Sequence, residues 1–355
     1  MNKLTKVGCS ALCGSLAAIA SANAGTLSVT GGADLTFTSL GDDVTGQPKG
    51  MGSNVNFKGS GELDNGWTFD LTIADANAGA FSAANITLTL GGLGKINFNQ
   101  GDSGNGIQAM DDKMPTAWEE AAGAGLSGGV KRVYGVGKSS NVQYTTPLVG
   151  EGIIGTTITL AYAHEVGATD VNDKGTKSAD NEAGRGYDAT ININPSMGTE
   201  ILSGLNLFFG GSILESRKNS SVEEDQYQGV GGITYDIGPV SIGAQWSGLY
   251  SGQDNLNGST AVYHTYKNHS FGIAFNVNDD LSVSYGEVQS RKAGYNGSNV
   301  QATTPAGRVV EVSSWQAAYT MGGASIRIAD VKVDNNLWSA GTNRNATIVS
   351  LGLAF

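Results

Sequence analysis

From residue 25 to its end, the chain repeats short runs in which every second side chain is apolar. The last run is the clearest, because Thr347, Val349, Leu351, Leu353 and Phe355 share one parity and mostly small residues take the other. Side chains of a β-strand point alternately to opposite faces of the sheet. Such a run therefore predicts a strand with one apolar face and one polar or small face.

The same alternation recurs often enough to predict sixteen strands. We expect them near 26–40, 54–63, 67–74, 84–90, 94–100, 139–146, 156–165, 185–194, 204–214, 226–237, 239–250, 263–277, 280–290, 309–320, 324–333 and 345–355.

The connections between these strands are alternately short and long. Short turns are expected at 64–66, 91–93, 238–239, 278–279 and 321–323, and long loops near 41–53, 101–138, 166–184, 215–225, 251–262, 291–308 and 334–344. Turns near 147–155 and 195–203 are less sharply defined. A soluble sandwich does not require this alternation, whereas an up-and-down barrel across a membrane does, with short periplasmic turns and long external loops. The sequence thus predicts an all-β, 16-stranded antiparallel transmembrane barrel.

Residues 1–24 have the features of a cleaved secretion signal. Lys3 and Lys6 precede a small apolar stretch, and Ala22-Asn23-Ala24 fits a small-x-small cleavage site. Both cysteines lie in this segment, and a lipid anchor at Cys13 is the alternative interpretation. We therefore divide the chain into a signal peptide, 1–24, and a barrel, 25–355.

Composition narrows the possible partners of the chain. Cleavage after residue 24 leaves 19 basic against 32 acidic residues, a formal charge of −13, which disfavours binding to nucleic acid. Glycine, at 53 of 355 residues, is about twice its usual share of ~7%. Mean hydropathy is −0.14, below that of helical membrane proteins. A membrane barrel can be this polar because half of each strand faces a wet interior.

Three patches of sequence resemble the general diffusion porins of Gram-negative outer membranes. They are the stretch from Gly66-Trp67-Thr68-Phe69 to Gly94-Lys95-Ile96, the long insertion directly after it, and the terminal aromatic Phe355. The resemblance implies an outer-membrane homotrimer of 16-stranded barrels with the third long loop folded into the channel. It also implies that the last strand, closed by Phe355, is recognised by the barrel-insertion machinery.

A barrel of about sixteen strands leaves an aqueous channel unless something narrows it. The longest loop, 101–138, is the candidate constriction, because long loops in compact proteins are usually functional or disordered. Its middle shows helix-start signals around Pro115, and flanking glycines allow it to fold back. We expect the acidic edge of the constriction to be formed by Asp111, Asp112, Glu119 and Glu120. A solvated loop surface is the alternative for these acids.

Basic side chains are expected to line the pore wall opposite these acids. By strand parity, Lys58 and Arg327 point inward near mid-strand, Lys95 and Arg344 point inward nearer the strand ends, and Arg132 lies where the loop returns. Acids facing bases produce a transverse field that orients dipolar solutes. Because residues 101–137 carry five acids and three bases, we expect a mild preference for cations.

The function predicted is passive diffusion of small hydrophilic solutes and ions, with no catalysis and no cofactor. Weak Ca²⁺ binding is considered at external acidic loops such as 170–175, although Lys174 stands where an oxygen ligand should be. A Gly-x-Ser-x-Gly match at 125–129 lies in a loop and is discounted as a catalytic serine. The alternatives are a substrate-specific channel with a saturable site, an outer-membrane barrel enzyme, and a secreted β-rich adhesin.

Overall fold

The fold is described from a computed structural model of the chain. It covers residues 25–41, 48–76, 83–137, 139–150, 154–167, 184–195, 200–216, 224–252, 262–295, 301–302 and 309–354. The predicted signal peptide and the terminal residue Phe355 lie outside the described residues, as does the acidic segment 170–175.

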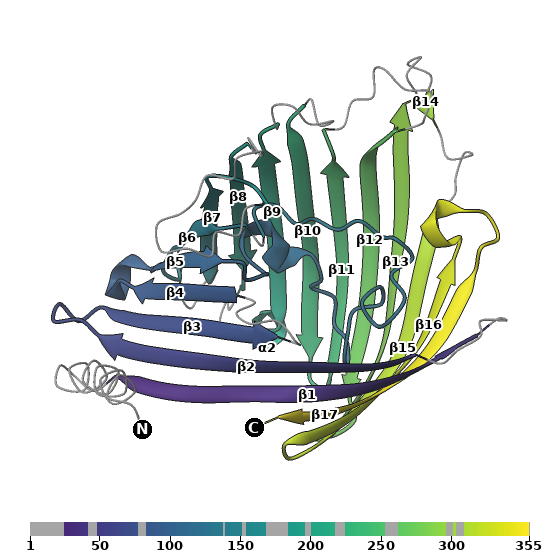
Figure 1. The fold of residues 1–355 in the computed structure, drawn as a ribbon, viewed down its shortest axis with the longest axis horizontal. Coiled ribbons are helices and arrows are strands. Elements are labelled where there is room, and N and C mark those ends of the chain that lie inside the picture. The colour runs from purple at the N-terminus through teal and green to yellow at the C-terminus, as the bar shows by residue number, and fades with distance from the viewer. Residues whose placement is uncertain are drawn as a thin grey trace, which may run out of the picture.

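The described residues form one closed antiparallel sheet (Figure 1). Its strands are β1 (Thr26–Leu40), β2 (Lys49–Glu62), β3 (Thr68–Ala76), β4 (Ala83–Thr89), β5 (Lys95–Gln100), β6 (Asn141–Thr145), β7 (Thr156–Ala163), β8 (Gly186–Ile193), β9 (Leu205–Leu214), β10 (Gln226–Ile237), β11 (Val240–Tyr250), β12 (Val262–Asn276), β13 (Leu281–Tyr295), β14 (Gln301–Ala302), β15 (Val310–Met321), β16 (Ala324–Asp334) and β17 (Arg344–Ala354).

Each long strand pairs with its neighbours along the chain, and β1 pairs with β17 to close the barrel. The two-residue strand β14 pairs only with the end of β13, which pairs directly with β15. Sixteen strands therefore surround the lumen, as the alternation predicts. The two ends of the barrel chain lie on the same side, which follows from the even number of strands (Figure 1).

The described part of the chain contains only short helices. They are η1 (Gly91–Leu93), η2 (Gly106–Met110), α2 (Glu200–Ser203) and η3 (Asn336–Trp338). None of them is long and apolar enough to cross a membrane.

Side chains alternate across the wall as the strand pattern requires. In β16, Ile326 and Ile328 are exposed on the outside, whereas Ala329, Val331 and Val333 are buried on the inside. Other strands also carry exposed large apolar side chains, among them Phe37, Phe209 and Leu353. The outer surface is thus suited to lipid, which is the condition for a spanning barrel.

Two expectations about local structure are wrong. Strand β2 begins at Lys49, five residues earlier than expected, because residues 49–53 continue the antiparallel ladder with β1 although they do not alternate regularly. The helix expected after Pro115 is absent, and the helical turn η2 lies at 106–110 instead. The backbone N–H groups of Ala117 and Glu119 donate hydrogen bonds to Ser284 and Gln316 of the barrel wall, and these bonds take the place of those within a helix.

The lumen contains buried apolar side chains where a polar wall would be expected. Phe208 and Val230 point inward and pack with Ile107, Met110, Met114 and Val133 of the segment between β5 and β6. Leu214 packs in the same way with Val136, Ala161 and Ala163. These inward residues are covered by the loop, and this explains their departure from the polar pattern.

Phe208→Ala should destabilise the barrel by about 3 kcal/mol, because Phe208 is fully buried and truncation leaves a cavity. Phe209→Ala is the matched control, since Phe209 is the next residue and is 49% exposed on the outer face. Reversible urea unfolding in detergent or lipid would measure both. Equal losses of stability in the two variants would show that the loop does not pack on Phe208.

Candidate functional site

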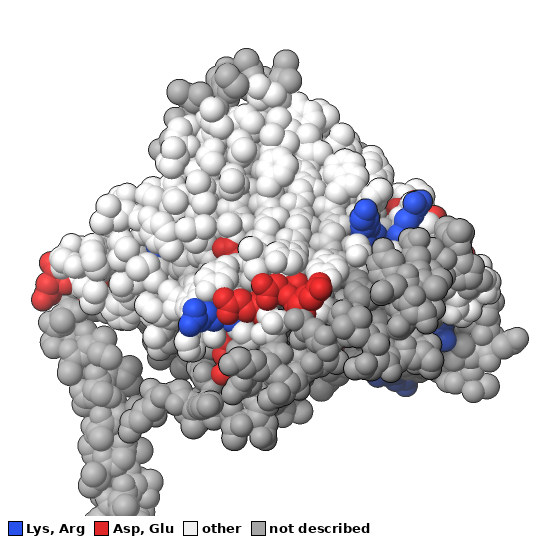
Figure 2. Space-filling model, turned by 90° about the horizontal axis from the view of Figure 1, so that it is seen from above, with Lys and Arg blue, Asp and Glu red and all other residues white. Residues whose placement is uncertain are grey.

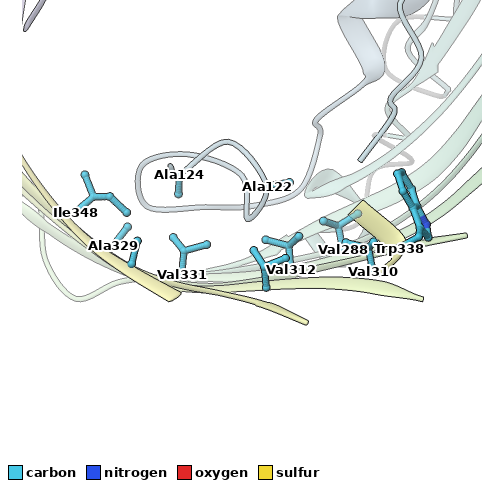
Figure 3. Close-up of a cluster of buried hydrophobic side chains, with 11 residues drawn as sticks. Ala122, Ala124, Val288, Val310, Val312, Ala329, Val331, Trp338 and Ile348 are labelled. Atoms are coloured by element: carbon cyan, nitrogen blue, oxygen red, sulfur yellow. The ribbon is translucent and has the colours of Figure 1, made fainter. Parts of the chain in front are cut away.

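The segment 101–137 lies against the inner wall of the barrel. Ala122 and Ala124 pack over inward side chains of β13, β15, β16 and β17, including Val312, Val331 and Ile348 (Figure 3). Two glycines allow this close approach. A Cβ on Gly125 would lie 2.7 Å from Ile348 Cδ1, and one on Gly106 would meet the carboxylate of Asp188, and both glycines have positive φ.

Inward polar side chains of the wall bond the backbone of this loop along its length. Asp188 Oδ2 accepts hydrogen bonds from Ile107 N (2.9 Å) and Val136 N (3.0 Å), near the two ends of the loop. Gln245 Oε1 accepts from Lys113 N (3.2 Å), while its Nε2 donates to Asp111 O (3.0 Å). Because these partners come from different strands, the loop is attached to the inner wall at several points along its course.

The wall also holds the middle and the return of the loop. Ser284 Oγ accepts from Ala117 N (2.8 Å), and Gln316 Oε1 accepts from Glu119 N (2.9 Å). Gln228 Oε1 accepts from Tyr134 N (2.7 Å) and Gly135 N (3.1 Å). Strand parity places these wall residues inside the barrel, but nothing in the sequence indicates that they hold the loop.

The four predicted acids are brought together on this loop. Asp112 and Glu119 are exposed, whereas Asp111 and Glu120 are partly buried. Arg132 forms an ion pair with Glu120 and is also attracted by Asp111, Asp112 and Glu119. Arg132 therefore belongs to the acidic cluster and not to the opposite wall, because the returning part of the loop runs back beside the acids.

The electrostatic environment raises the pKa of two of these acids. Burial, the charge of Asp112 and a hydrogen bond to Asp112 raise the pKa of Asp111 from 3.8 to about 7, although Arg132 opposes the shift. Burial and the charge of Asp112 also raise the pKa of Glu119, against the attraction of Arg327 and Arg132. The charge of the loop therefore changes near neutral pH.

The predicted wall bases do not form one cluster. Arg327 Nη1 lies 3.2 Å from Asp34 Oδ1, and its guanidinium lies 6.0 Å from the Trp118 ring of the loop. Lys58 Nζ lies 3.6 Å from Asp70 Oδ1. Arg327 thus lies beside the loop and is paired with Asp34 of β1 across the intervening strand β17, whereas Lys58 is paired with Asp70 of the neighbouring strand β3.

Lys95 and Arg344 stand apart from this group. Lys95 is the first residue of β5, after a short turn, and Arg344 is the first residue of β17, after a long loop. They consequently lie towards opposite ends of the barrel. Asp34, Asp70 and Trp118 were not singled out from the sequence, although the parity of the two acids already directs them inward.

Charged side chains are unevenly distributed on the molecule. On the face shown in Figure 2, Asp and Glu gather mainly in one row, with Lys or Arg at one end of it. A concentrated row of acids next to bases produces a local field rather than a uniform one.

The sequence was compared with protein families and with solved structures. Residues 8–309 match the model of the Gram-negative porins. The chain belongs to the Gram-negative porin family. No curated protein sequence matches the chain significantly.

Solved porin structures share the fold of this porin at low sequence identity. A porin refined at 1.8 Å resolution is 13% identical, with 93% of this chain and 100% of that chain covered and a TM-score of 0.65. Salmonella typhi OmpF in complex with daunomycin is 14% identical, with 93% and 97% covered and a TM-score of 0.67. Vibrio cholerae OmpT, in a trimer form, is 12% identical, with 93% and 99% covered and a TM-score of 0.60. The family and the fold together identify an outer-membrane channel protein.

Proposed function

We propose that this porin allows passive diffusion of small hydrophilic solutes and ions, with a mild preference for cations. The observation that carries the proposal is the loop 101–137, which contacts the inner wall through apolar and polar residues and exposes Asp112 and Glu119. A loop fixed in this way narrows the channel but does not fill it with packed side chains. No cofactor is expected to take part.

The charge balance favours cations over anions. Arg132 is paired with Glu120, Arg327 with Asp34, and Lys58 with Asp70. These three bases are therefore offset. On residues 101–137 of the loop, five acids outnumber the three bases Lys113, Lys131 and Arg132, and Asp112 and Glu119 are exposed. Reversal potentials in planar bilayers under a salt gradient test this preference, and a clear preference for anions at pH 8 would overturn it.

The cation preference should weaken as the pH falls through about 7, the pKa of Asp111. The sign follows from the raised pKa, because Asp111 is ionised above this value and neutral below it. In Asp111→Asn the step near pH 7 should disappear and the preference should resemble that of the wild type at low pH. Reversal potentials between pH 5 and pH 9 measure both. A step of the same size in the variant would assign the titration to another group.

A substrate-specific channel is the second candidate, and one group of side chains in the lumen favours it. Arg327, Asp34 and Trp118 place a guanidinium, a carboxylate and an aromatic ring together in the lumen. Such a group can bind a dipolar solute in one orientation. A saturable, solute-dependent block of single-channel current would support this candidate, and conductance that scales only with bulk conductivity would support general diffusion.

We further propose a homotrimer that is surrounded by outer-membrane lipid and inserted by the barrel-insertion machinery through its last strand and Phe355. Cleavage after Ala24 would precede insertion, and weak Ca²⁺ binding would be confined to external acidic loops. The family likeness supports the trimer. Sedimentation in detergent together with mass spectrometry of the purified protein tests both the oligomer and the cleavage site.

A further inference from the structure

The connection between β16 and β17 contributes a buried side chain to the interior of the barrel. Trp338, in the helical turn η3 of this connection, is 6% exposed and belongs to the same apolar cluster as Val310 of the wall and Ala124 of the loop 101–137 (Figure 3). We call residues 335–343 the strap and the loop 101–137 the constriction loop. The strap, which joins two barrel strands, thus packs against the constriction loop.

The backbone of the strap has a conformation that side chains disfavour. Among the described residues other than glycine, positive φ occurs at Asn335 (52°), Leu337 (55°) and Trp338 (58°). Asparagine visits this region readily, but leucine and tryptophan rarely do. Such a conformation persists only where the surrounding structure over-determines it, and it is often found at functional sites. Tertiary contacts, and not local preference, therefore hold the strap in place.

One set of these contacts joins the strap to the barrel wall. Trp338 Nε1 donates a hydrogen bond to the backbone oxygen of Ser290 in β13 (2.9 Å). The indole ring lies 5.8 Å from the ring of Tyr266 in β12, measured between centroids, and Lys292 Nζ lies 4.6 Å from its centre. A cation over an indole face is attracted by the ring. Trp338 is thus the anchor of the strap.

A second set of contacts joins the strap to the constriction loop. Leu337 N donates to Gly128 O (3.0 Å). A Cβ on Gly129 would lie 2.5 Å from Leu337 Cδ2 and 3.5 Å from Trp338 Cζ3, and one on Gly128 would lie 2.7 Å from Val310 Cγ1 of the wall. Both glycines have positive φ. Gly128 and Gly129 therefore lie between the strap and the wall, where there is no room for a side chain.

The strap contacts the constriction loop where the loop returns towards its charged edge. Wall side chains bond the loop backbone at Glu119 and again at Lys131. Gly128, which the strap contacts, lies between these two points. The same stretch leads to Arg132, which forms the ion pair with Glu120. A contact at this place influences where Arg132 returns beside the acids.

We propose that the strap is a positioning element of the channel, in which Trp338 is the anchor and Leu337 holds the return of the constriction loop. The proposal rests on the proposed function, because it takes the loop to be the constriction. Loss of the anchor releases the disfavoured backbone conformation, and the strap then moves away from Gly128 and Gly129. The stretch 120–132 fluctuates more widely as a result, and so does the width of the channel.

Single-channel recording of the full-length protein tests the role of the anchor. Trp338→Ala should raise the variance of the open-channel current several-fold. Trp338→Phe keeps an aromatic ring against Tyr266 and Lys292 and loses only the N–H donor, so it should restore most of the wild-type behaviour. Trp246→Ala is the matched control, because Trp246 is 53% exposed on the outer face of β11, and it should leave the variance unchanged.

Thiol labelling distinguishes this local role from a general loss of stability. Residues 25–355 contain no cysteine, so Leu126→Cys reports on the stretch beside the strap, and Met110→Cys reports on the part of the loop that packs on Phe208. Each is prepared with and without Trp338→Ala and is treated with a water-soluble maleimide, and the protein without an introduced cysteine is the blank. Trp338→Ala should accelerate labelling at residue 126 several-fold and leave residue 110 unchanged, because only the stretch beside the strap opens.

Wild-type current variance in Trp338→Ala would overturn the proposal, and so would an unchanged rate of labelling at residue 126. Equal acceleration at residues 110 and 126 would also overturn it, because Trp338 would then support the barrel as a whole. Large discrete current steps in all of these variants would leave the channel itself standing whatever the role of the strap. An absence of steps in the wild type would instead overturn the proposed function.

Discussion

Replacing Asp111, Asp112, Glu119 and Glu120 together by Asn or Gln should reverse the ion preference of the channel from cations to anions. The variant keeps Lys113, Lys131 and Arg132 on the loop and frees Arg132 from its partner Glu120. Basic charge then dominates the narrowest part of the lumen, and charge at a constriction decides which ions enter. The sign of the reversal potential in a salt gradient measures the change.

The matched control is Asp279→Asn with Asp280→Asn, which removes acids from an exposed short turn far from the loop in sequence and at one end of the barrel. This variant should keep the wild-type reversal potential. A fourfold neutralised loop that still prefers cations would show that the acids do not line the conducting path.

Asp188→Ala should loosen the constriction and increase both the mean conductance and the noise of the open channel. The variant leaves the N–H groups of Ile107 and Val136 without their shared acceptor. Each unsatisfied buried N–H costs about 1–3 kcal/mol, so both ends of the loop lose a strong constraint. Single-channel recording at fixed voltage measures the current level and its variance.

Asp188→Asn is the control for this prediction, because its amide oxygen can still accept both hydrogen bonds while the charge is removed. It should behave like the wild type. If the Ala variant conducts at the wild-type level and with wild-type noise, the loop is held by its apolar contacts alone. If the Asn variant is as noisy as the Ala variant, the charge of Asp188 matters more than its hydrogen bonds.

The strands could be predicted from the sequence because their chemistry repeats locally. The run 345–355 alternates cleanly, and its strand, β17, is found within one residue of the expected start. The start of β2 could not be predicted in this way. Residues 49–53 are rich in glycine and polar side chains, and only their pairing with β1 reveals the strand.

The inward course of the constriction loop was expected from its length and from the resemblance to porins. Its attachment could not be predicted, since Asp188 and Gln316 are far from the loop in sequence and meet it only in the closed barrel. For the same reason, Arg132 was expected on the pore wall. Its partner, Glu120, lies only twelve residues away, but the turn that joins them depends on tertiary packing.

Inward Phe208 illustrates a related limit of sequence patterns. Its parity places it in a lumen that should be polar, and the pattern alone cannot distinguish an error of register from a covered site. The structure shows that Ile107, Met110 and Met114 cover it. An apolar residue at an inward position therefore marks where the loop contacts the wall.

The most direct test of a closed, water-filled barrel is the single-channel conductance of the purified full-length protein in a planar bilayer. We predict large, discrete current steps that appear in groups of three, with current proportional to voltage at low voltage and to the bulk conductivity of the salt. A correctly folded, membrane-inserted protein that gives no steps, or a conductance that large polar solutes do not reduce, would contradict an open aqueous lumen narrowed by the loop 101–137.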